Sequence, residues 1–255
     1  MIETRRSQYG QIADLLRARI ADGSYPAGTA LPSEDRLSEE LGVSRVTVNR
    51  AIGLLRAAGD VRVRRGAGTI VRALPRITRD AVARYAARDA GTGANQVEVS
   101  RLGLRSRTAY TRIERLKATA EVAAALGLRR GATVLLRGRV LYADDEPTQI
   151  ADSYLPWEIA KGSAELMRPD AGPGGSYGRL AERGHGPVRF AEDVQVRLPT
   201  EAEQRTLLLD ETQPVFQITH LAYAADDRPV EVCLHVLAGH LWTLRYRWDD
   251  PAAAG

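Results

Sequence analysis

Four polar side chains early in one predicted helix carry the groups that proteins use to read base pairs. They are Arg45, Thr47, Asn49 and Arg50. A guanidinium forms two hydrogen bonds with guanine in the major groove of DNA, and a carboxamide forms two with adenine. Exposed together on one helix face, these residues would contact base edges. On these residues alone, the alternative is a solvated helix face that binds no partner.

The apolar residues around this polar group predict the helix that positions it. They recur at i, i+3, i+4 and i+7, which gives one buried stripe, and they are Val48, Ala51, Ile52 and Leu55. Ser44 can cap the start of this helix, and Gly59 can end it. The polar side chains therefore point away from the buried stripe.

A shorter helix is expected just before this one. Ser33 is its candidate cap, and Glu34 and Asp35 lie in its first turn, where the helix dipole favours acidic side chains. Gly42 can take the left-handed conformation that ends the helix, so the turn to the next helix is very short. An earlier amphipathic helix, from about residue 9 to 22, should pack behind both.

A basic hairpin is predicted after these helices. Val61 and Val63 alternate with arginines, and a return strand begins near Ile70 after a turn that contains two glycines. Such glycines allow close approach to phosphate or to the minor groove, although a plain glycine-rich turn is the alternative. The candidate contacts of the hairpin are Arg64, Arg65 and Gly66. Two helices around a tight turn, followed by a basic wing, predict a winged helix-turn-helix.

The segment Leu31–Val71 resembles the GntR family of bacterial transcription regulators through Leu-Pro-Ser-Glu, Gly-Val-Ser-Arg, Thr-Val, Ala-Ile and Gly-x-Gly-Thr, in that order. The resemblance implies that Arg45 and Thr47 contact bases and phosphates and that Asn49 faces the groove. Asp35 stands where some relatives carry a DNA-contacting Arg, and Asn49 replaces a common Arg, as in the subfamily of histidine-utilisation repressors. The predicted DNA-binding set is Ser33, Ser44, Arg45, Thr47, Asn49, Arg50, Arg64, Arg65 and Gly66.

Two similar stretches of helix plus hairpin predict an α+β fold for the rest of the chain. The stretch Gly127–Pro147 can be placed over Leu208–Pro229, and each holds a strand, a turn with two aspartates, a proline and a second strand. With a further strand expected near residues 96–104, they favour one antiparallel domain. The expected division is a DNA-binding domain over 1–75, a linker with a possible central helix over 76–94, an effector-binding and dimerisation domain over 95–250 and a disordered tail over 251–255.

This rear half resembles the UTRA effector domain, which has a chorismate-lyase-like fold. The resemblance rests on five short motifs: Arg137-Gly-Arg139, Glu146-Pro147, Ser153-Tyr-Leu-Pro156, Ser176-Tyr177 and Pro229-Val-Glu231. Arg137 and Arg139 lie two apart on a predicted strand, so both should project to one face and could bind a carboxylate or phosphate; the alternative is a solvent-facing pair. The final strand, from Val236 to Trp242, departs from the pattern of relatives. The predicted effector contacts are Arg137, Arg139, Glu146, Ser176, Tyr177 and Glu231.

Composition narrows the class of protein. The net charge is +4, and residues 1–75 hold twelve basic against eight acidic side chains while the rest is balanced, which suits one domain that meets a polyanion. Cys233 is the only cysteine, which excludes an internal disulfide and favours the cytoplasm. No apolar run reaches the ~20 residues of a membrane span. No histidine or acid has metal-ligand spacing, and no nucleophile has an identifiable base.

These observations and resemblances predict a ligand-responsive transcriptional regulator and no enzyme activity. We expect a cytoplasmic homodimer that binds double-stranded operator DNA as a repressor and is released by a small anionic metabolite. One alternative is a DNA-binding dimer that responds to no ligand. A second and less favoured alternative is a lyase-like enzyme, which the fold alone suggests. No cofactor, metal or membrane partner is expected.

Overall fold

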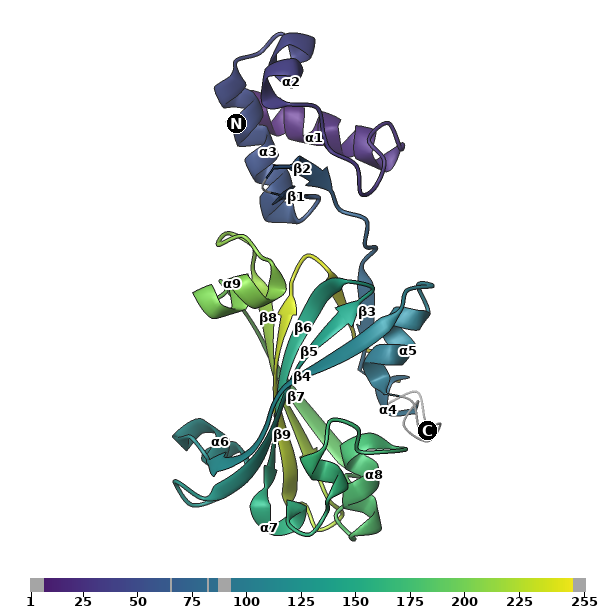
Figure 1. The fold of residues 1–255 in the computed structure, drawn as a ribbon, viewed down its shortest axis with the longest axis vertical. Helices are drawn as coiled ribbons and strands as arrows, with labels where there is room; N and C mark the ends of the chain where they lie inside the picture. The colour runs from purple at the N-terminus through teal and green to yellow at the C-terminus, as the bar shows by residue number, and fades with distance from the viewer. Residues whose placement is uncertain (1–6, 65, 82, 87–92, 250–255) are drawn as a thin grey trace. The chain divides into compact units, whose positions relative to one another are not determined.

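The computed structural model describes residues 7–64, 66–81, 83–86 and 93–249. The chain forms two compact units (Figure 1). The first comprises Met1–Pro75 with Asp210–Gln213, and the second comprises Arg76–Leu209 with Pro214–Gly255. Among the described residues, every helix is too short or too polar to cross a lipid bilayer. The tail expected over 251–255 lies outside the described residues.

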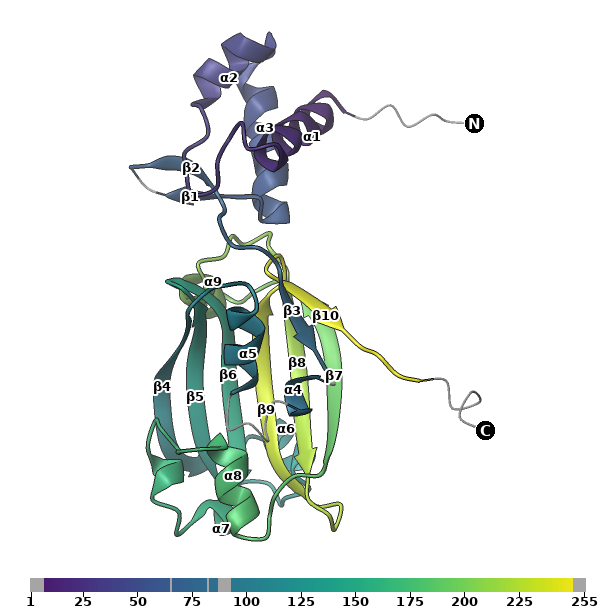
Figure 2. The same ribbon diagram turned by 90° about the vertical axis from the view of Figure 1, so that its right-hand side faces the viewer.

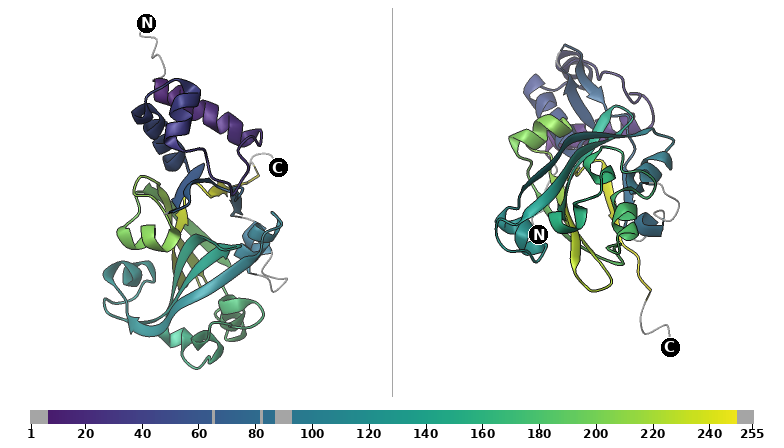
Figure 3. Two further views of the ribbon diagram at one scale, coloured as in Figure 1. Left: turned by 45° about the horizontal axis from the view of Figure 1, so that its top comes forward. Right: turned by 60° about the horizontal axis from the view of Figure 1, so that its bottom comes forward.

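The first unit is a winged helix-turn-helix, as the sequence predicts. Its elements are α1 (Gln8–Ala21), α2 (Glu34–Leu41), α3 (Arg45–Ala58), β1 (Val61–Arg64) and β2 (Gly68–Val71). The three helices, purple to dark blue in Figure 3, share one core in which Leu16, Leu37 and Leu55 are fully buried. The two strands pair antiparallel and form the wing.

The helix ends of this unit lie where the sequence predicts them. Ser33 and Ser44 each accept a hydrogen bond from the backbone N–H three residues ahead, at 3.2 Å. Gly42 and Gly59 end α2 and α3 with φ angles of 64° and 80°, which other residues adopt at a cost. Local sequence therefore fixes the orientation of α3 against α2.

The second unit is built on a six-stranded antiparallel sheet in the order β4-β5-β6-β9-β8-β7. Figure 2 shows the six strands side by side. Their bounds are β4 (Ser106–Lys117), β5 (Thr133–Ala143), β6 (Glu146–Pro156), β7 (Arg189–Arg197), β8 (Val215–Tyr223) and β9 (Pro229–Ala238). Each predicted hairpin is present, as β5/β6 and as β8/β9, and each follows a helix. The two hairpins meet at the centre of the sheet through β6 and β9.

Helices cover both faces of this sheet. On one face lie α5 (Ala94–Ser100), α7 (Trp157–Ala160), the 3-10 turn Glu165–Met167 and α8 (Gly175–Glu182), and on the other lie α6 (Ala120–Ala125) and α9 (Glu201–Leu207) (Figures 1 and 2). Leu135 and Leu155 pack with Leu180 of α8, whereas Val134 and Val232 pack with Val122 of α6. Alternate residues of the central strands therefore enter two separate cores, because successive side chains of a strand point to opposite faces.

The segment expected as a linker, residues 76–94, differs from that expectation. Its first part is a strand, β3 (Ile77–Asp80), which pairs in parallel with β10 (Trp242–Arg245). A short helix, α4 (Ala83–Ala86), follows. Ile77 is fully buried and Arg79 is 2% exposed. The partner strand lies more than 160 residues away in the sequence, so only the tertiary structure shows that this segment is part of the second unit.

The prediction of a strand near residues 96–104 is wrong, because the structure has the helix α5 over Ala94–Ser100. The sequence Gln-Val-Glu-Val-Ser alternates polar and apolar residues, which favoured a strand. The buried residues of α5 are Asn95, Glu98 and Val99, which have the i, i+3, i+4 spacing of a helix. Two of these three are polar, so a pattern based on apolar residues alone could not reveal the helical period.

Candidate functional site

The exposed face of α3 carries the predicted base-reading residues. Arg45, Asn49 and Arg50 are exposed and Thr47 is half-buried, while the apolar stripe with Val48 faces the core. Arg45 has a side chain that is 65% exposed. The structure therefore brings these side chains together on one surface of the first unit, near the amino-terminal end of the helix.

An acidic residue of α2 holds two of these side chains in place. The Asn49 amide donates to Glu34 Oε1 at 2.9 Å, and Arg45 Nε donates to Glu34 Oε2 at 3.2 Å. Arg45 also forms an ion pair with Asp35 at 3.3 Å. The hydrogen bond from Asn49 lowers the pKa of Glu34, and the hydrogen bond and charge of Arg45 lower it further. Partial burial opposes this shift but is the weaker effect. Sequence reasoning missed this contact, because it assigned Glu34 only to the helix dipole.

The two capping serines and the wing complete this surface. Ser33 and Ser44 keep exposed positions, and Ser44 Oγ also lies 2.8 Å from Thr47 Oγ1. Arg64 is exposed at the end of β1, and Gly66 has a φ angle of 79°, which suits the tip of a hairpin. Arg65, also predicted to contact DNA, lies outside the described residues.

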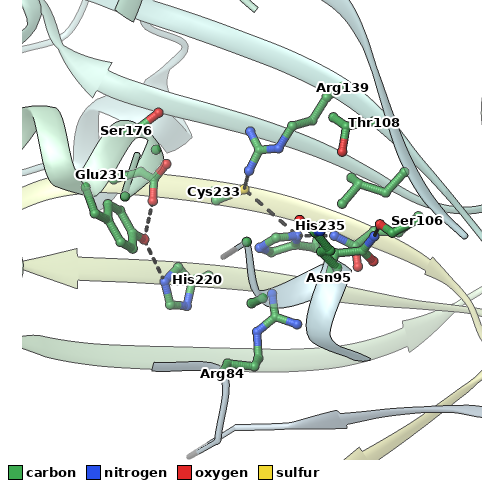
Figure 4. A pocket seen from close by; sticks show the side chains of 18 of the residues that line it. Arg84, Asn95, Ser106, Thr108, Arg139, Ser176, His220, Glu231, Cys233 and His235 are labelled. Carbon is green, nitrogen blue, oxygen red and sulfur yellow. Dashed lines mark hydrogen bonds between the residues drawn. The ribbon is translucent and has the colours of Figure 1, made fainter. Parts of the chain in front are cut away.

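A cavity of about 410 Å³ opens in the second unit and is shown in Figure 4. Strands β4, β5, β6, β8 and β9 form its floor, and β3, α4, α5, α8 and the loop before α8 contribute its walls. Few of its lining residues are apolar. The polar lining consists of Arg79, Arg84, Asn95, Gln96, Ser106, Thr108, Tyr110, Arg139, Gln149, Ser176, Tyr177, His220, Glu231, Cys233 and His235.

Four of the six predicted effector contacts line this cavity: Arg139, Ser176, Tyr177 and Glu231. Arg139 Nη1 donates to Ser153 Oγ at 2.9 Å, whereas the partner of its Nη2 among the described residues is the sulfur of Cys233 at 3.9 Å. A thiol is a weak acceptor. One end of the Arg139 guanidinium is thus left for a stronger acceptor in the cavity.

Arg137 and Glu146 do not line the cavity. Arg137 is 1% exposed and donates to the backbone carbonyls of Leu166, Arg168 and Pro169, the latter two at 2.8 and 3.1 Å. It therefore holds the segment that leads into the loop before α8, although strand alternation alone placed it beside Arg139. Glu146 is the first residue of β6 and lies at the turn of the hairpin.

A chain of buried polar groups crosses one side of the cavity. The Tyr177 hydroxyl donates to Glu231 and lies 3.2 Å from Nε2 of His220, whose Nδ1 lies 3.1 Å from Glu192. Glu192 is also paired with Arg79. Burial would raise the pKa of Glu192, but the hydrogen bond from His220 and the charge of Arg79 hold it at about 2. The carboxylate is therefore ionised at neutral pH.

Two carboxamides in the lining have oxygen atoms that are buried without a hydrogen-bond partner among the described residues. Asn95 donates to Ser106 Oγ at 2.9 Å and Gln149 lies 2.9 Å from His235 Nδ1, but Oδ1 of Asn95 and Oε1 of Gln149 have no donor. Burial lowers the pKa of His235 well below its usual value, so its imidazole is neutral. These acceptors require donors, and a ligand with hydroxyl or amino groups would supply them.

Sequence reasoning did not select several of these cavity residues. Cys233 and His235 follow the predicted contact Glu231 at alternate positions of β9 and line the same cavity, so this alternation was the signal that could have found them. Burial raises the pKa of Cys233 to about 11, so the thiol stays protonated and is a poor nucleophile. Among the described residues, no group of three His, Cys, Asp or Glu is placed to hold a metal ion.

Comparison with known proteins identifies both units. Residues 8–71 match the bacterial regulatory proteins of the GntR family, and residues 101–241 match the UTRA domain. An HTH-type transcriptional regulator of Streptomyces coelicolor is 30% identical over 97% of this chain and 94% of its own length. The HTH-type transcriptional regulator GgaR of Escherichia coli is 30% identical over 88% of this chain and 84% of its own.

Solved structures agree with these sequence matches. The crystal structure of PhnF from Mycobacterium smegmatis is 26% identical, with a TM-score of 0.59 over 93% of this chain and 98% of that one. The ligand-binding domain of a GntR-family regulator from Bordetella bronchiseptica is 29% identical, with a TM-score of 0.51 over 57% of this chain and 90% of that one. These matches, the winged helix of the first unit and the cavity-bearing sheet of the second place the chain in the GntR family of transcriptional regulators, as a DNA-binding protein with a UTRA effector domain.

Proposed function

We propose that the protein is a cytoplasmic homodimeric repressor that leaves its operator when a small anionic metabolite enters the cavity of the second unit. The proposal rests on Arg139, which lines a cavity of about 410 Å³. Among the described residues, the hydrogen-bond partner of its Nη2 is the weak sulfur acceptor of Cys233. A carboxylate or phosphate oxygen would form a shorter, charge-assisted hydrogen bond with it. The solved relative described as a ligand-binding domain supports a ligand role for this unit.

The composition of the cavity supports a particular chemistry for the metabolite. In addition to Arg139, Ser176 offers a hydroxyl donor. The side-chain oxygens of Asn95 and Gln149 are acceptors that no described donor reaches. An anionic group near Arg139 with hydroxyl or amino groups elsewhere on the same molecule would satisfy both sets. A purely hydrophobic ligand would leave these polar groups unpaired.

In the first unit, α3 would enter the major groove and the wing would lie along the adjacent backbone. Arg45 and Asn49 provide the bidentate groups that discriminate guanine and adenine. The predicted contacts Ser33, Ser44 and Arg64 lie at exposed positions, where they can donate to phosphate. Two copies would read two half-sites about one helical turn apart, so the operator should be a palindrome.

The test compares binding to the upstream region of the protein's own gene with binding to unrelated duplex of equal length, by fluorescence anisotropy. We expect specific binding that is tighter by about 10³-fold or more at physiological salt. Pools of phosphorylated and carboxylated metabolites are then added to the complex, and release by one pool is expected. Equal affinity for both duplexes would refute the DNA-reading role, whereas specific binding that no pool weakens would favour the ligand-independent alternative. Sedimentation of the complex tests the homodimer.

A further inference from the structure

Arg79 is a buried cation in the cavity wall that the sequence motifs do not select. Arg79 is 2% exposed, and among the described residues only Nη2 of its three guanidinium nitrogens has a partner, Glu192. Nε and Nη1 are buried without a hydrogen-bond partner among the described residues. An unmade hydrogen bond of a buried charged group is costly, and a ligand in the cavity could complete it.

The carboxylate that pairs with Arg79 is already shared. Oε1 of Glu192 also lies 3.1 Å from Nδ1 of His220, and its pKa of about 2 keeps it ionised. The other nearby cation, Arg84, donates through Nη1 to both oxygens of Glu98 at 2.6 Å. Within the described part of the wall, Arg79 has buried N–H groups without a hydrogen-bond partner, and Arg84 has none.

Arg79 lies close in the sequence to the end of the first unit. Arg79 belongs to β3, which begins at Ile77, two residues after the first unit ends at Pro75. Its neighbour β10 places Trp242 opposite Ile77, and Trp242 is fully buried, with its indole N–H bonded to the carbonyl of Thr148 at 3.0 Å. A ligand that forms a hydrogen bond with Arg79 would therefore contact the strand whose chain leads directly to the DNA-binding unit.

We propose that Arg79 is a ligand-contacting residue of the cavity, that it donates to an anionic oxygen of the ligand, and that this contact transmits occupancy of the cavity to β3. The proposal rests on the ligand role proposed above for the same cavity. It adds a second cationic contact, on a different element from Arg139, and assigns it the link to the first unit. The shared ligand chemistry is an acidic oxygen, from either a phosphate or a carboxylate.

The experiment uses Trp242 as a reporter beside β3. In the full-length chain, Trp157→Phe and Trp248→Phe leave Trp242 as the single tryptophan. Inorganic phosphate and malonate are titrated separately, with sodium chloride at matched ionic strength as the control, and the emission of Trp242 is recorded. We expect a saturable change with at least one of the two anions and none with chloride, and the anion that binds more tightly identifies the acidic group.

The decisive variant is the double variant Arg79→Gln/Glu192→Gln, which removes the cation without leaving a buried carboxylate unpaired. We expect anion binding to this variant to be at least tenfold weaker than to the parent. Arg79→Lys keeps the charge beside Glu192 but loses the guanidinium fork, so it should weaken anion binding at least threefold. This single variant provides the test if the double variant does not fold. Binding within twofold of the parent in the variant that folds would overturn the proposal.

Arg139→Gln separates this proposal from the function on which it rests. Loss of binding in Arg139→Gln but not in the Arg79 variants would keep the cavity as a ligand site and reject Arg79 as a contact. If neither anion changes Trp242 emission in the parent, the Arg79 proposal fails, while specific operator binding by the same sample would leave the DNA-reading role intact.

Discussion

Arg137 offers the sharpest test of the structure, because strand alternation predicts a ligand contact and the structure shows an anchor. Its guanidinium donates to three backbone carbonyls between residues 166 and 169 and to the hydroxyl of Tyr110 at 3.2 Å. Arg137→Ala would remove all four hydrogen bonds. The carbonyls of Arg168 and Pro169 lie on exposed residues and can turn to water, whereas Leu166 is fully buried.

The magnitude follows from these contacts. An unsatisfied buried carbonyl costs about 1–3 kcal/mol, and loss of the remaining charged hydrogen bonds and of side-chain packing adds a similar amount. We expect the free energy of unfolding of the second unit to fall by about 3 kcal/mol, which for a unit of this size lowers Tm by roughly 6–12 °C. Urea unfolding followed by circular dichroism measures the change.

The matched control is Arg112→Ala on the neighbouring strand, β4. The Arg112 side chain is 56% exposed and pairs with Glu114 at 3.4 Å, so its removal should change the free energy of unfolding by less than about 0.5 kcal/mol. If Arg137→Ala were equally mild, the anchoring role would be refuted. A mild effect together with loss of ligand response would restore the role that the sequence analysis expected.

Three further predictions concern the two sites. Arg45→Ala should cost about 1–3 kcal/mol of operator affinity and relax base preference, whereas Arg64→Ala should weaken binding evenly across sequences and flatten its salt dependence; equal losses of Arg45→Ala on operator and random duplex would contradict its role. Glu192 has a folded pKa of about 2 against a usual 4.5, so the stability it contributes is present above pH 4.5 and is lost as pH falls toward 2. That contribution is about 3 kcal/mol. Glu192→Gln should be less stable at neutral pH, and its free energy of unfolding should depend less on pH between 4.5 and 2. An unchanged pH dependence of the free energy of unfolding would reject the low pKa of Glu192. Cys233, buried with a pKa of about 11, should react with a thiol reagent at pH 8 far more slowly in the native protein than in urea, and similar rates would show that the thiol is accessible.

The helices and hairpins that position both sites could be predicted from the sequence, since local pattern specifies them. Serine caps, left-handed glycines and an apolar stripe at helical spacing are properties of neighbouring residues, so α2, α3 and the wing follow from them. The paired hairpins β5/β6 and β8/β9 follow in the same way from alternation and turn residues. The motifs also brought Arg139, Ser176, Tyr177 and Glu231 into one set before the cavity was known.

Tertiary structure alone decided the rest, because it depends on contacts between distant segments. Arg137 and Arg139 share a strand and a face, but the segment 166–169 covers the first with carbonyls while the second meets the cavity. Likewise β3 becomes a strand because it pairs with β10 from the far end of the chain, and Arg79 of β3 lies buried in the cavity wall. Sequence fixes which side chains can bind an anion, and packing decides which of them keep hydrogen-bond donors free to do so.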